Sequence, residues 1–150
     1  MLVGLISDTH GTLPAAVARA FTGCERILHA GDVGSPEVLH ELEAIAPTTA
    51  VAGNTDGWAL AGVLDHVVRV TLAETAVLVA HRIEDALRAH RAKPASVIVV
   101  GHTHVPFVDR REGALVVNPG SASRPRSESG ATVGLLTIAG HRPSARIVTL

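Results

Sequence analysis

Seven side chains that could bind metal ions follow directly after apolar segments of this sequence. Asp, Asn or His comes after five such segments, in the stretches SDTHG, AGDV, GNTD, VAHR and GHTH. Ligand sites in open α/β sheets form beyond the carboxyl ends of the strands, so five strands ending in this way would direct these side chains into one crevice. The set comprises Asp8, His10, Asp32, Asn54, His81, His102 and His104.

The composition of this set favours two metal ions over one. Imidazole and carboxylate groups without thiolates suit divalent ions such as Mn, Fe, Ni or Zn. Seven ligands are too many for one tetrahedral zinc, but they suit two ions, especially if one carboxylate bridges them.

The spacing of two pairs, Asp8-x-His10 and His102-x-His104, agrees with a two-ion site. Residues i and i+2 of a strand share a face, and their Cα atoms would be about 6.5 Å apart if the strand geometry persists to its end. That spread can place one imidazole on each of two ions about 3.5–4 Å apart, the separation found in two-metal hydrolytic sites. Taken alone, His102 and His104 could equally bind one ion together.

Each member of the set also has an ordinary structural explanation. Asp32 after a strand would be a helix N-cap or a turn residue, and Asn54 in GNTDG would be a turn residue. His81 alone would be a hydrogen-bonded interior histidine, and His29 is a candidate for hydrogen bonding to a ligand. Coincidence at five strand ends is the weaker hypothesis. The other histidines lack the pattern and are assigned no role: His40, His66, His90 and His141.

The predicted elements place these residues at strand ends. Residues 2–7, 26–30 and 48–53 are apolar runs typical of buried parallel strands, and helices are predicted between them over 12–22 and 36–46. A strand pair (66–72 and 75–80), a helix (83–93) and a strand (96–100) follow. Further strands are predicted over 106–110, 114–118, 132–140 and 145–150. The pattern indicates two packed sheets flanked by helices.

Length and composition exclude several classes of protein. The chain has 150 residues, and with no repeat or linker it is predicted to form one domain, residues 1–150. The single cysteine, Cys24, excludes an internal disulfide framework and suits a reducing compartment. The net charge is -1 with no basic stripe, so no nucleic-acid-binding signature is present. The N-terminal apolar run is too short for a signal peptide and no segment could span a membrane, so a cytoplasmic protein is predicted.

The motifs SDTHG (7–11), AGDV (30–33), GNTD (53–56), GHTH (101–104) and NPGS (118–121) resemble those of the calcineurin-like metallophosphoesterases, specifically their small single-domain phosphodiesterase branch. The resemblance covers essentially the whole chain in the family's motif order. It implies an α/β (α+β) fold, a four-layer α-β-β-α sandwich of two mixed sheets. It also implies metal-dependent hydrolysis of a small phosphoester, a diester or a monoester, by a metal-bridging hydroxide.

The same resemblance implies a role for each ligand. Asp8, His10 and His104 would hold the first ion, whereas Asn54, His81 and His102 would hold the second. Asp32 would bridge the two ions, and Asp32 and Asn54 would contribute to catalysis through them. The implied cofactor is a pair of divalent transition-metal ions, manganese first, with iron, nickel and zinc as alternatives.

The sequence departs from the family pattern near the site. Thr55 replaces a histidine that in many relatives can protonate the leaving group; losing a general acid typically costs about 10²–10⁴-fold, so good leaving groups should be preferred. Asp56 is predicted to be a turn or supporting residue, not a replacement acid. Arg82 replaces a glycine; it is either a solvated surface residue or a bidentate donor that, with Asn54, binds the substrate phosphate. The segment from His81 to the GHTH motif is also shorter than usual, which predicts a more open site.

The NPGS turn is predicted to lie near the site. Asn118 and Ser121 are candidates for supporting the ligand loops, whereas Arg124 and Arg126 are expected to face solvent or form internal ion pairs.

Two functions of different classes compete. The leading hypothesis is a phosphodiesterase or phosphatase. The alternative is a catalytically weak binding module that resembles the retromer scaffold subunit of eukaryotes, which has this fold; a sensor with vestigial turnover is a third. A scaffold can lose metal ligands without penalty, so the complete ligand set favours the enzyme. The oligomeric state stays open, a homo-oligomer included.

Overall fold

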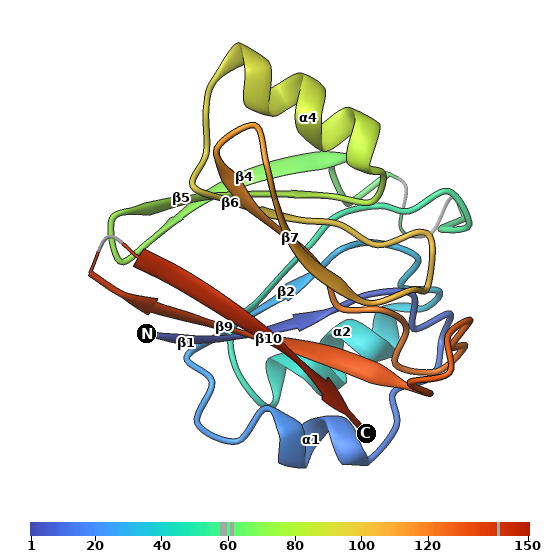
Figure 1. Cartoon of the computed structure of the whole chain (residues 1–150). Coiled ribbons are helices and arrows are strands. Elements are labelled where there is room, and N and C mark those ends of the chain that lie inside the picture. Colours follow the sequence, from blue (N-terminus) through green and yellow to red (C-terminus); the bar gives the residue numbers. More distant parts are fainter. Residues whose placement is uncertain (58–59, 61, 141) are drawn as a thin grey trace.

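Two five-stranded sheets pack face to face in this computed structural model, which describes every residue except 58–59, 61 and 141 (Figure 1). His141, which was assigned no role, therefore lies outside the described residues. The first sheet has the order β10 (Arg142–Thr149), β9 (Thr132–Ala139), β1 (Leu2–Ile6), β2 (Arg26–His29), β3 (Thr48–Ala50). The second has the order β4 (Val67–Leu72), β5 (Thr75–Ala80), β6 (Val97–Val99), β8 (Ala114–Asn118), β7 (Phe107–Arg111).

Helices cover the outer faces of both sheets. Figure 1 shows α1 (Ala16–Ala20) and α2 (Pro36–Glu43) against the first sheet and α4 (Ile83–Ala92) against the second. Each sheet mixes parallel and antiparallel neighbours: β1 pairs with β2 in parallel but with β9 antiparallel, and β6 pairs with β5 and β8 in parallel. The predicted four-layer sandwich of two mixed sheets is confirmed.

The alternation of strand side chains explains why the sheets are apolar on both faces. Val97 and Val99 of β6 point into the layer between the sheets, whereas Ile98 packs toward α4. In β1, Leu5 belongs to the central layer and Ile6 to the layer beneath α1 and α2. Successive side chains of a strand point to opposite faces, so a strand covered on both sides must be a continuous apolar run.

The β4–β5 hairpin agrees with the prediction, whereas the start of the last strand differs from it. The β4–β5 connection is a two-residue hairpin, as predicted, and Ala73 and Glu74 both have positive φ (44° and 66°), the requirement of a type I′ turn. The last strand begins at Arg142 and so includes Pro143, although it was predicted to begin at 145. Proline is tolerated there because β10 lies at the edge of its sheet.

The first helix is shorter than predicted. It begins at Ala16 instead of near residue 12, because the Thr12 N–H first donates to the Thr9 carbonyl in a turn. The strands also end before their predicted limits: β1 ends at Ile6, β3 at Ala50 and β6 at Val99. The polar residues that follow these strands therefore lie in loops.

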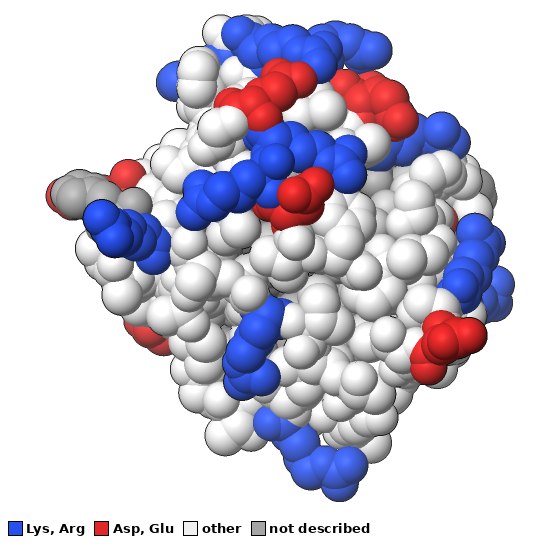
Figure 2. Space-filling model, viewed as in Figure 1, with Lys and Arg blue, Asp and Glu red and all other residues white. Residues whose placement is uncertain are grey.

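Charged side chains of both signs are mixed on the surface. On the face shown in Figure 2, several Lys and Arg side chains lie beside Asp or Glu. Arg91 contacts Glu112 at 2.5 Å, and Arg88 of α4 contacts Asp85 at 3.1 Å. None of the helices in the described parts of the chain is long and apolar enough to cross a membrane.

Candidate metal centre

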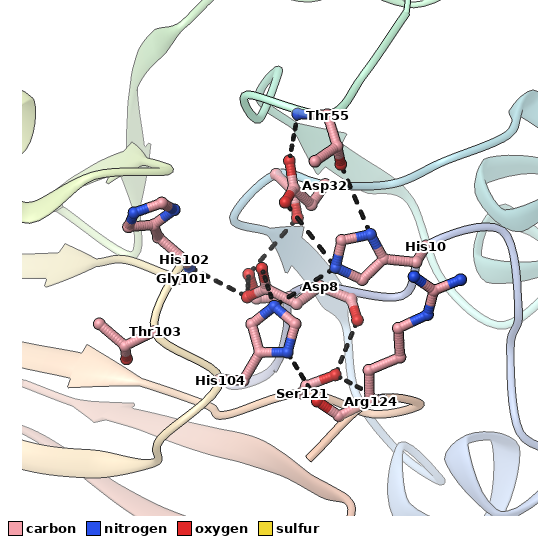
Figure 3. Close-up of polar contacts among 12 residues, drawn as sticks. Asp8, His10, Asp32, Thr55, Gly101, His102, Thr103, His104, Ser121 and Arg124 are labelled. Carbon is pink, nitrogen blue, oxygen red and sulfur yellow. Dashed lines mark hydrogen bonds and ion pairs between the residues drawn. The ribbon is translucent and has the colours of Figure 1, made fainter. Parts of the chain in front are cut away.

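All seven predicted ligands lie in loops that follow the carboxyl ends of strands. Figure 3 shows Asp8, His10, Asp32, His102 and His104 in these loops. Asp8 and His10 follow β1, Asp32 follows β2, and Asn54 follows β3 at a short distance. His81 follows β5, and the remaining two histidines follow β6. Four of them, each offering one atom within 4.8 Å of the others, form a group that could hold a metal ion: Asp8, His10, Asp32 and His104.

The remaining three residues, Asn54, His81 and His102, are linked through contacts of His81. The Nε2 atom of His81 is 3.5 Å from the Asp32 Oδ2 atom and 3.0 Å from the Asn54 Oδ1 atom. The rings of His81 and His102 meet edge to face, with centroids 5.1 Å apart. The same Asp32 Oδ2 atom lies 3.8 Å from Nε2 of His10. Asp32 is thus within reach of both groups, the position that a bridging carboxylate needs.

Left-handed backbone conformations place five of these residues. Positive φ angles are rare outside glycine and cost about 1–3 kcal/mol where they are forced, and they concentrate at functional sites. The other three non-glycine positive-φ positions in the described chain are in tight turns, at Ala73, Glu74 and Glu112. The five at the centre have φ angles between 46° and 73°: Asp8, His10, Asp32, His102 and His104.

This backbone corrects the spacing argument. The i, i+2 pairs were expected to share a face as they would in a strand, but both members of each pair are in the left-handed region beyond the strand end. Loop-to-loop hydrogen bonds hold them instead: the Asp8 N–H donates to the Gly31 carbonyl at 3.0 Å, and the His10 N–H donates to the Asp32 carbonyl at 2.9 Å.

Backbone carbonyls fix which nitrogen of two histidines carries the proton. Nδ1 of His104 donates to the Arg124 carbonyl at 2.6 Å, and Nδ1 of His81 donates to the Ala30 carbonyl at 2.8 Å. A carbonyl can only accept, so in the neutral ring Nε2 keeps its lone pair. In both residues that lone pair faces the carboxylates of the centre.

The arrangement fits a cation. Nε2 of His104 lies 3.3 Å from Nε2 of His10 and 3.2 Å from Oδ1 of Asp8. The Asp8 Oδ1 atom is buried and receives no hydrogen bond, because the His104 proton is on Nδ1. Buried polar atoms are rarely left without partners. Lone pairs that converge in this way, from imidazoles and carboxylates, are what a divalent ion would satisfy.

The pKa shifts of three predicted ligands, His10, His102 and Asp32, favour the deprotonated forms that bind an ion at neutral pH. Burial lowers the pKa of His10 and of His102. Burial acts to raise the pKa of Asp32, but the neighbouring His81 side chain and the hydrogen bond from the Thr55 N–H outweigh it, so the pKa is lowered. Metal ligands must be deprotonated, so neutral imidazoles beside an ionised carboxylate suit this role.

Two members have pKa shifts in the opposite direction. Burial raises the pKa of Asp8, against the opposing hydrogen bond from Ser7. Burial acts to lower the pKa of His81, but its hydrogen bonds with Asp32 and the Ala30 carbonyl outweigh it, so the pKa is raised. A bound cation would favour the deprotonated form of both groups, and so would oppose both shifts.

Hydroxyl groups and an amide support the ligand loops. The Ser7 hydroxyl and the His102 N–H both donate to Oδ2 of Asp8, at 2.6 and 3.1 Å, which leaves Oδ1 free to face the centre. The Asn118 amide donates to the Gly101 carbonyl at 2.8 Å, and the Ser121 hydroxyl donates to the Asp8 carbonyl at 2.8 Å. The supporting role predicted for Asn118 and Ser121 agrees with these contacts.

Two further residues support the loops, Asp56 as predicted and His29 through a partner that was not predicted. The Asp56 carboxylate accepts hydrogen bonds from the N–H groups of Val33, Gly34 and Gly53, so it ties two loops together. His29, expected to bond a ligand, instead contacts Thr9, with its Nε2 atom 2.9 Å from the Thr9 hydroxyl oxygen. Thr9 lies between two ligands in sequence.

Arg82 and Thr55 lie at the edge of the centre. Arg82 is exposed, and it lines a cavity of about 190 Å³ together with Asn54 and His81. Its charge, after burial, also lowers the pKa of His102. The Thr55 hydroxyl lies 3.4 Å from Nδ1 of His10. A His10 ligand that uses Nε2 would donate its Nδ1–H to that oxygen, as ligating histidines commonly do.

Sequence reasoning missed contacts made by the backbone. The Arg124 carbonyl that orients His104 and the Thr55 N–H that donates to Asp32 at 2.9 Å leave no signature in residue type. Ser123, whose hydroxyl donates to the Thr9 carbonyl at 2.7 Å, was also missed. Its place two residues after the NPGS motif was the available signal.

Comparisons with known proteins agree with this geometry. A family model described as the calcineurin-like phosphoesterase superfamily domain matches residues 1–141. A probable metallophosphoesterase of Methanothermobacter thermautotrophicus is 36% identical, over 99% of this chain and 92% of that protein. A solved structure of an archaeal phosphodiesterase superposes with a TM-score of 0.80 at 25% identity, covering 99% of this chain and 100% of that one.

The similarity to a second solved structure supports the fold assignment only, because the sequence identity is low. Vacuolar protein sorting 29 of Cryptosporidium parvum superposes with a TM-score of 0.76 at 21% identity, covering 98% of this chain and 96% of that one. The motif order, the two-sheet sandwich and the cluster of Asp and His at the strand ends lead to the same assignment as the family model. This chain belongs to the calcineurin-like phosphoesterase superfamily.

Proposed function

We propose that this protein hydrolyses phosphoester bonds with the help of two divalent transition-metal ions. Asp8, His10 and His104 would hold one ion, and a second set would hold the other: Asn54, His81 and His102. Manganese is the preferred ion, with iron, nickel and zinc as alternatives. The observation that carries the proposal is the position of Asp32, whose Oδ2 atom faces Nε2 of His10 at 3.8 Å and Nε2 of His81 at 3.5 Å.

The residues divide the work between binding ions and binding substrate. When bound, the ions would acidify a water molecule as the nucleophile and stabilise charge on the phosphoryl oxygens. Asp32 and Asn54 would act through the ions, by holding them beside the substrate. Asn54 is exposed and its Oδ1 atom faces His81, so its amide nitrogen is free to donate to a phosphoryl oxygen. Arg82, at the mouth of the cavity beside it, would supply a bidentate donor.

Protonation of the leaving group is the weak point of the site. Thr55 occupies the place where a general acid would be expected, and its hydroxyl faces His10. A threonine hydroxyl is too weak an acid to donate a proton efficiently near neutral pH. Esters with weakly basic leaving groups, such as aryl phosphates, should therefore be the better substrates.

The direct test is hydrolysis of bis(p-nitrophenyl) phosphate and p-nitrophenyl phosphate by the protein with added Mn²⁺ or Ni²⁺. We expect metal-dependent release of p-nitrophenol, its abolition in Asp32→Ala, and loss of bound metal in that variant by elemental analysis. Asp109→Asn is the matched control, because Asp109 is an exposed carboxylate of β7 that pairs with Arg111. It should keep both the activity and the metal.

The scaffold hypothesis predicts a different outcome. The likeness to vacuolar protein sorting 29 shows that the same fold occurs in a protein of another name. If the wild type and Asp32→Ala were equally inert with several metals, a binding role would replace hydrolysis. The complete set of seven ligands, all at one edge, supports the enzyme. A reducing, cytoplasmic compartment is part of the proposal and is supported by the single free cysteine, Cys24.

A further inference from the structure

The backbone of Arg124 is fixed directly beside the first group of ligands. Its carbonyl accepts from Nδ1 of His104 at 2.6 Å, and its N–H donates to the Ser121 hydroxyl oxygen at 2.8 Å. That hydroxyl in turn donates to the Asp8 carbonyl at 2.8 Å. The start of the Arg124 side chain is therefore positioned by two of the predicted ligand residues.

The side chain of Arg124 carries an unmatched positive charge to the rim of the centre. Figure 3 shows its guanidinium beside His10. The charge of Arg124 acts on that ring. Burial is the largest cause of the lowered pKa of His10, two carboxylates oppose it, and Arg124 makes a smaller contribution that lowers the pKa. The residue is exposed, and within the described part of the chain no carboxylate lies within 4.0 Å of its guanidinium. The internal ion pair considered from the sequence is absent from those residues.

The rim therefore carries an arginine on each flank. Arg82 lies beside the Asn54–His81 group and Arg124 beside the His10–His104 group. Both are exposed, and the charge of each acts on a ligand histidine, Arg82 on His102 and Arg124 on His10. An anion bound over the centre would lie between them.

The number of free oxygens on a phosphoester decides what such an arginine can do. Two metal ions can engage two non-bridging oxygens of the reacting phosphoryl group. A diester has only those two, whereas a monoester has a third and a second negative charge. A guanidinium binds phosphate oxygens as a planar, bidentate, permanently charged donor. We propose that Arg124 binds the third oxygen of a phosphomonoester, and so favours monoesters over diesters at the centre; this rests on the proposed hydrolytic function.

The test compares the two ester classes in one set of variants. With metal present, we expect Arg124→Gln to lower kcat/KM for p-nitrophenyl phosphate by about 10- to 100-fold, the effect of losing a charged hydrogen bond. For bis(p-nitrophenyl) phosphate the same change should cost less than about 3-fold, since an exposed charge without a direct contact contributes little. Arg124→Lys keeps the charge but loses the bidentate geometry, and should recover only part of the monoester rate.

A binding measurement gives a readout without turnover. By calorimetry on the metal-loaded protein, Arg124→Gln should weaken the binding of inorganic phosphate by about 10-fold and leave the weaker binding of dimethyl phosphate within about 2-fold. The control is Arg110→Gln, which removes an exposed arginine of β7 that lines a separate cavity with His90 and Arg142. Arg110→Gln should change neither the hydrolysis of the two esters nor the binding of the two anions. Thermal unfolding and metal content should be unaltered in Arg124→Gln, because only the side chain changes while the backbone contacts stay.

The outcomes separate the two proposals. Suppose that the wild type hydrolyses esters and that Arg124→Gln lowers kcat/KM equally for monoesters and diesters, or for neither. The role of Arg124 is then overturned, and the hydrolytic function stands. If the wild type hydrolyses neither ester with any of the metals, both proposals are overturned.

Discussion

The position of the proton distinguishes two of the predicted ligand histidines from His29. His81 and His104 each donate from Nδ1 to a backbone carbonyl, so their Nε2 lone pairs face the centre. His29 has the opposite arrangement: the Gly31 N–H donates to its Nδ1 at 3.2 Å, so its Nε2–H donates to the Thr9 hydroxyl. That hydroxyl in turn donates a hydrogen bond to the Val33 carbonyl at 2.9 Å. Both ring nitrogens of His29 thus form hydrogen bonds within the protein, so neither is available to bind a metal ion.

A test of the His29 assignment uses pH. Burial, with a smaller effect of the His81 charge, lowers the pKa of His29 from 6.5 to about 3. Between these values the unfolded chain binds a proton that the folded chain does not, so stability is present above pH 6.5 and is lost as the pH falls. The loss should approach about 1.4 kcal/mol per pH unit. His29→Gln should remove that contribution to the slope, as measured by urea unfolding between pH 4.5 and 7.5 in the presence of a chelator. An unchanged slope would contradict it.

Residue types alone could predict the ligands but not these roles. The seven ligand candidates could be found because Asp, Asn and His recur after apolar runs, a pattern that is independent of the exact geometry. His29 carries the same imidazole, and only its partners, the Gly31 N–H and the Thr9 hydroxyl, show that it is structural. The Arg124 carbonyl is invisible in the sequence for a similar reason: every residue has one.

At the scale of elements, the strands end early and the loops do the positioning. β1 and β6 stop at Ile6 and Val99, and the ligands follow in left-handed conformations. The existence of these strands could be predicted because buried parallel strands are continuous apolar runs. The loop geometry could not, because left-handed conformations of Asp and His are imposed by contacts from other loops. The i, i+2 pairs therefore lie at the predicted edge of the sheets, but in left-handed loop conformations and not in the extended conformation that was expected.

Close packing of these loops predicts an effect of Gly101→Ala. A Cβ atom at this position would overlap the Ser7 hydroxyl and lie 2.8 Å from Oδ2 of Asp8. It would push apart the pair whose hydrogen bond, at 2.6 Å, orients the Asp8 carboxylate. We expect a loss of about 1–3 kcal/mol in the free energy of unfolding, the usual cost of overpacking, together with weaker metal binding.

The matched control for this change is Gly57→Ala. A Cβ atom there would meet no atom of the described residues within 4 Å, apart from its chain neighbours, so the substitution adds volume without a clash with them. Urea unfolding and a Mn²⁺ titration, run on both variants, separate the local overlap from a general effect of replacing glycine. Equal behaviour of the two variants would show that the packing at Gly101 does not position Asp8.

At the scale of the whole molecule, the predicted ligands come from both sheets. Asp8, His10 and Asp32 come from loops of the first sheet, whereas His81 and His104 come from loops of the second. The layer between the sheets is built from small and branched apolar side chains, among them Val3, Val79 and Val99. An ion bound at the centre would therefore join the two halves of the sandwich at the edge where charge is crowded and the buried Asp8 Oδ1 atom has no hydrogen bond.

This arrangement predicts that metal binding stabilises the entire fold. An ion that binds the folded chain but not the unfolded one adds about 2.7 kcal/mol per site at a free concentration 100 times its Kd. For a chain of this size, each kcal/mol raises Tm by roughly 2–4 °C, so one filled site should raise it by roughly 5–10 °C. Calorimetry with Mn²⁺, reversed by a chelator, measures the shift. Asp109→Asn should keep it, whereas Asp32→Ala should lose most of it, because Asp32 lies against both groups of ligands. If no divalent ion changed the Tm of the wild type, the converging lone pairs would be satisfied by protons alone, and this edge of the sandwich would hold no metal.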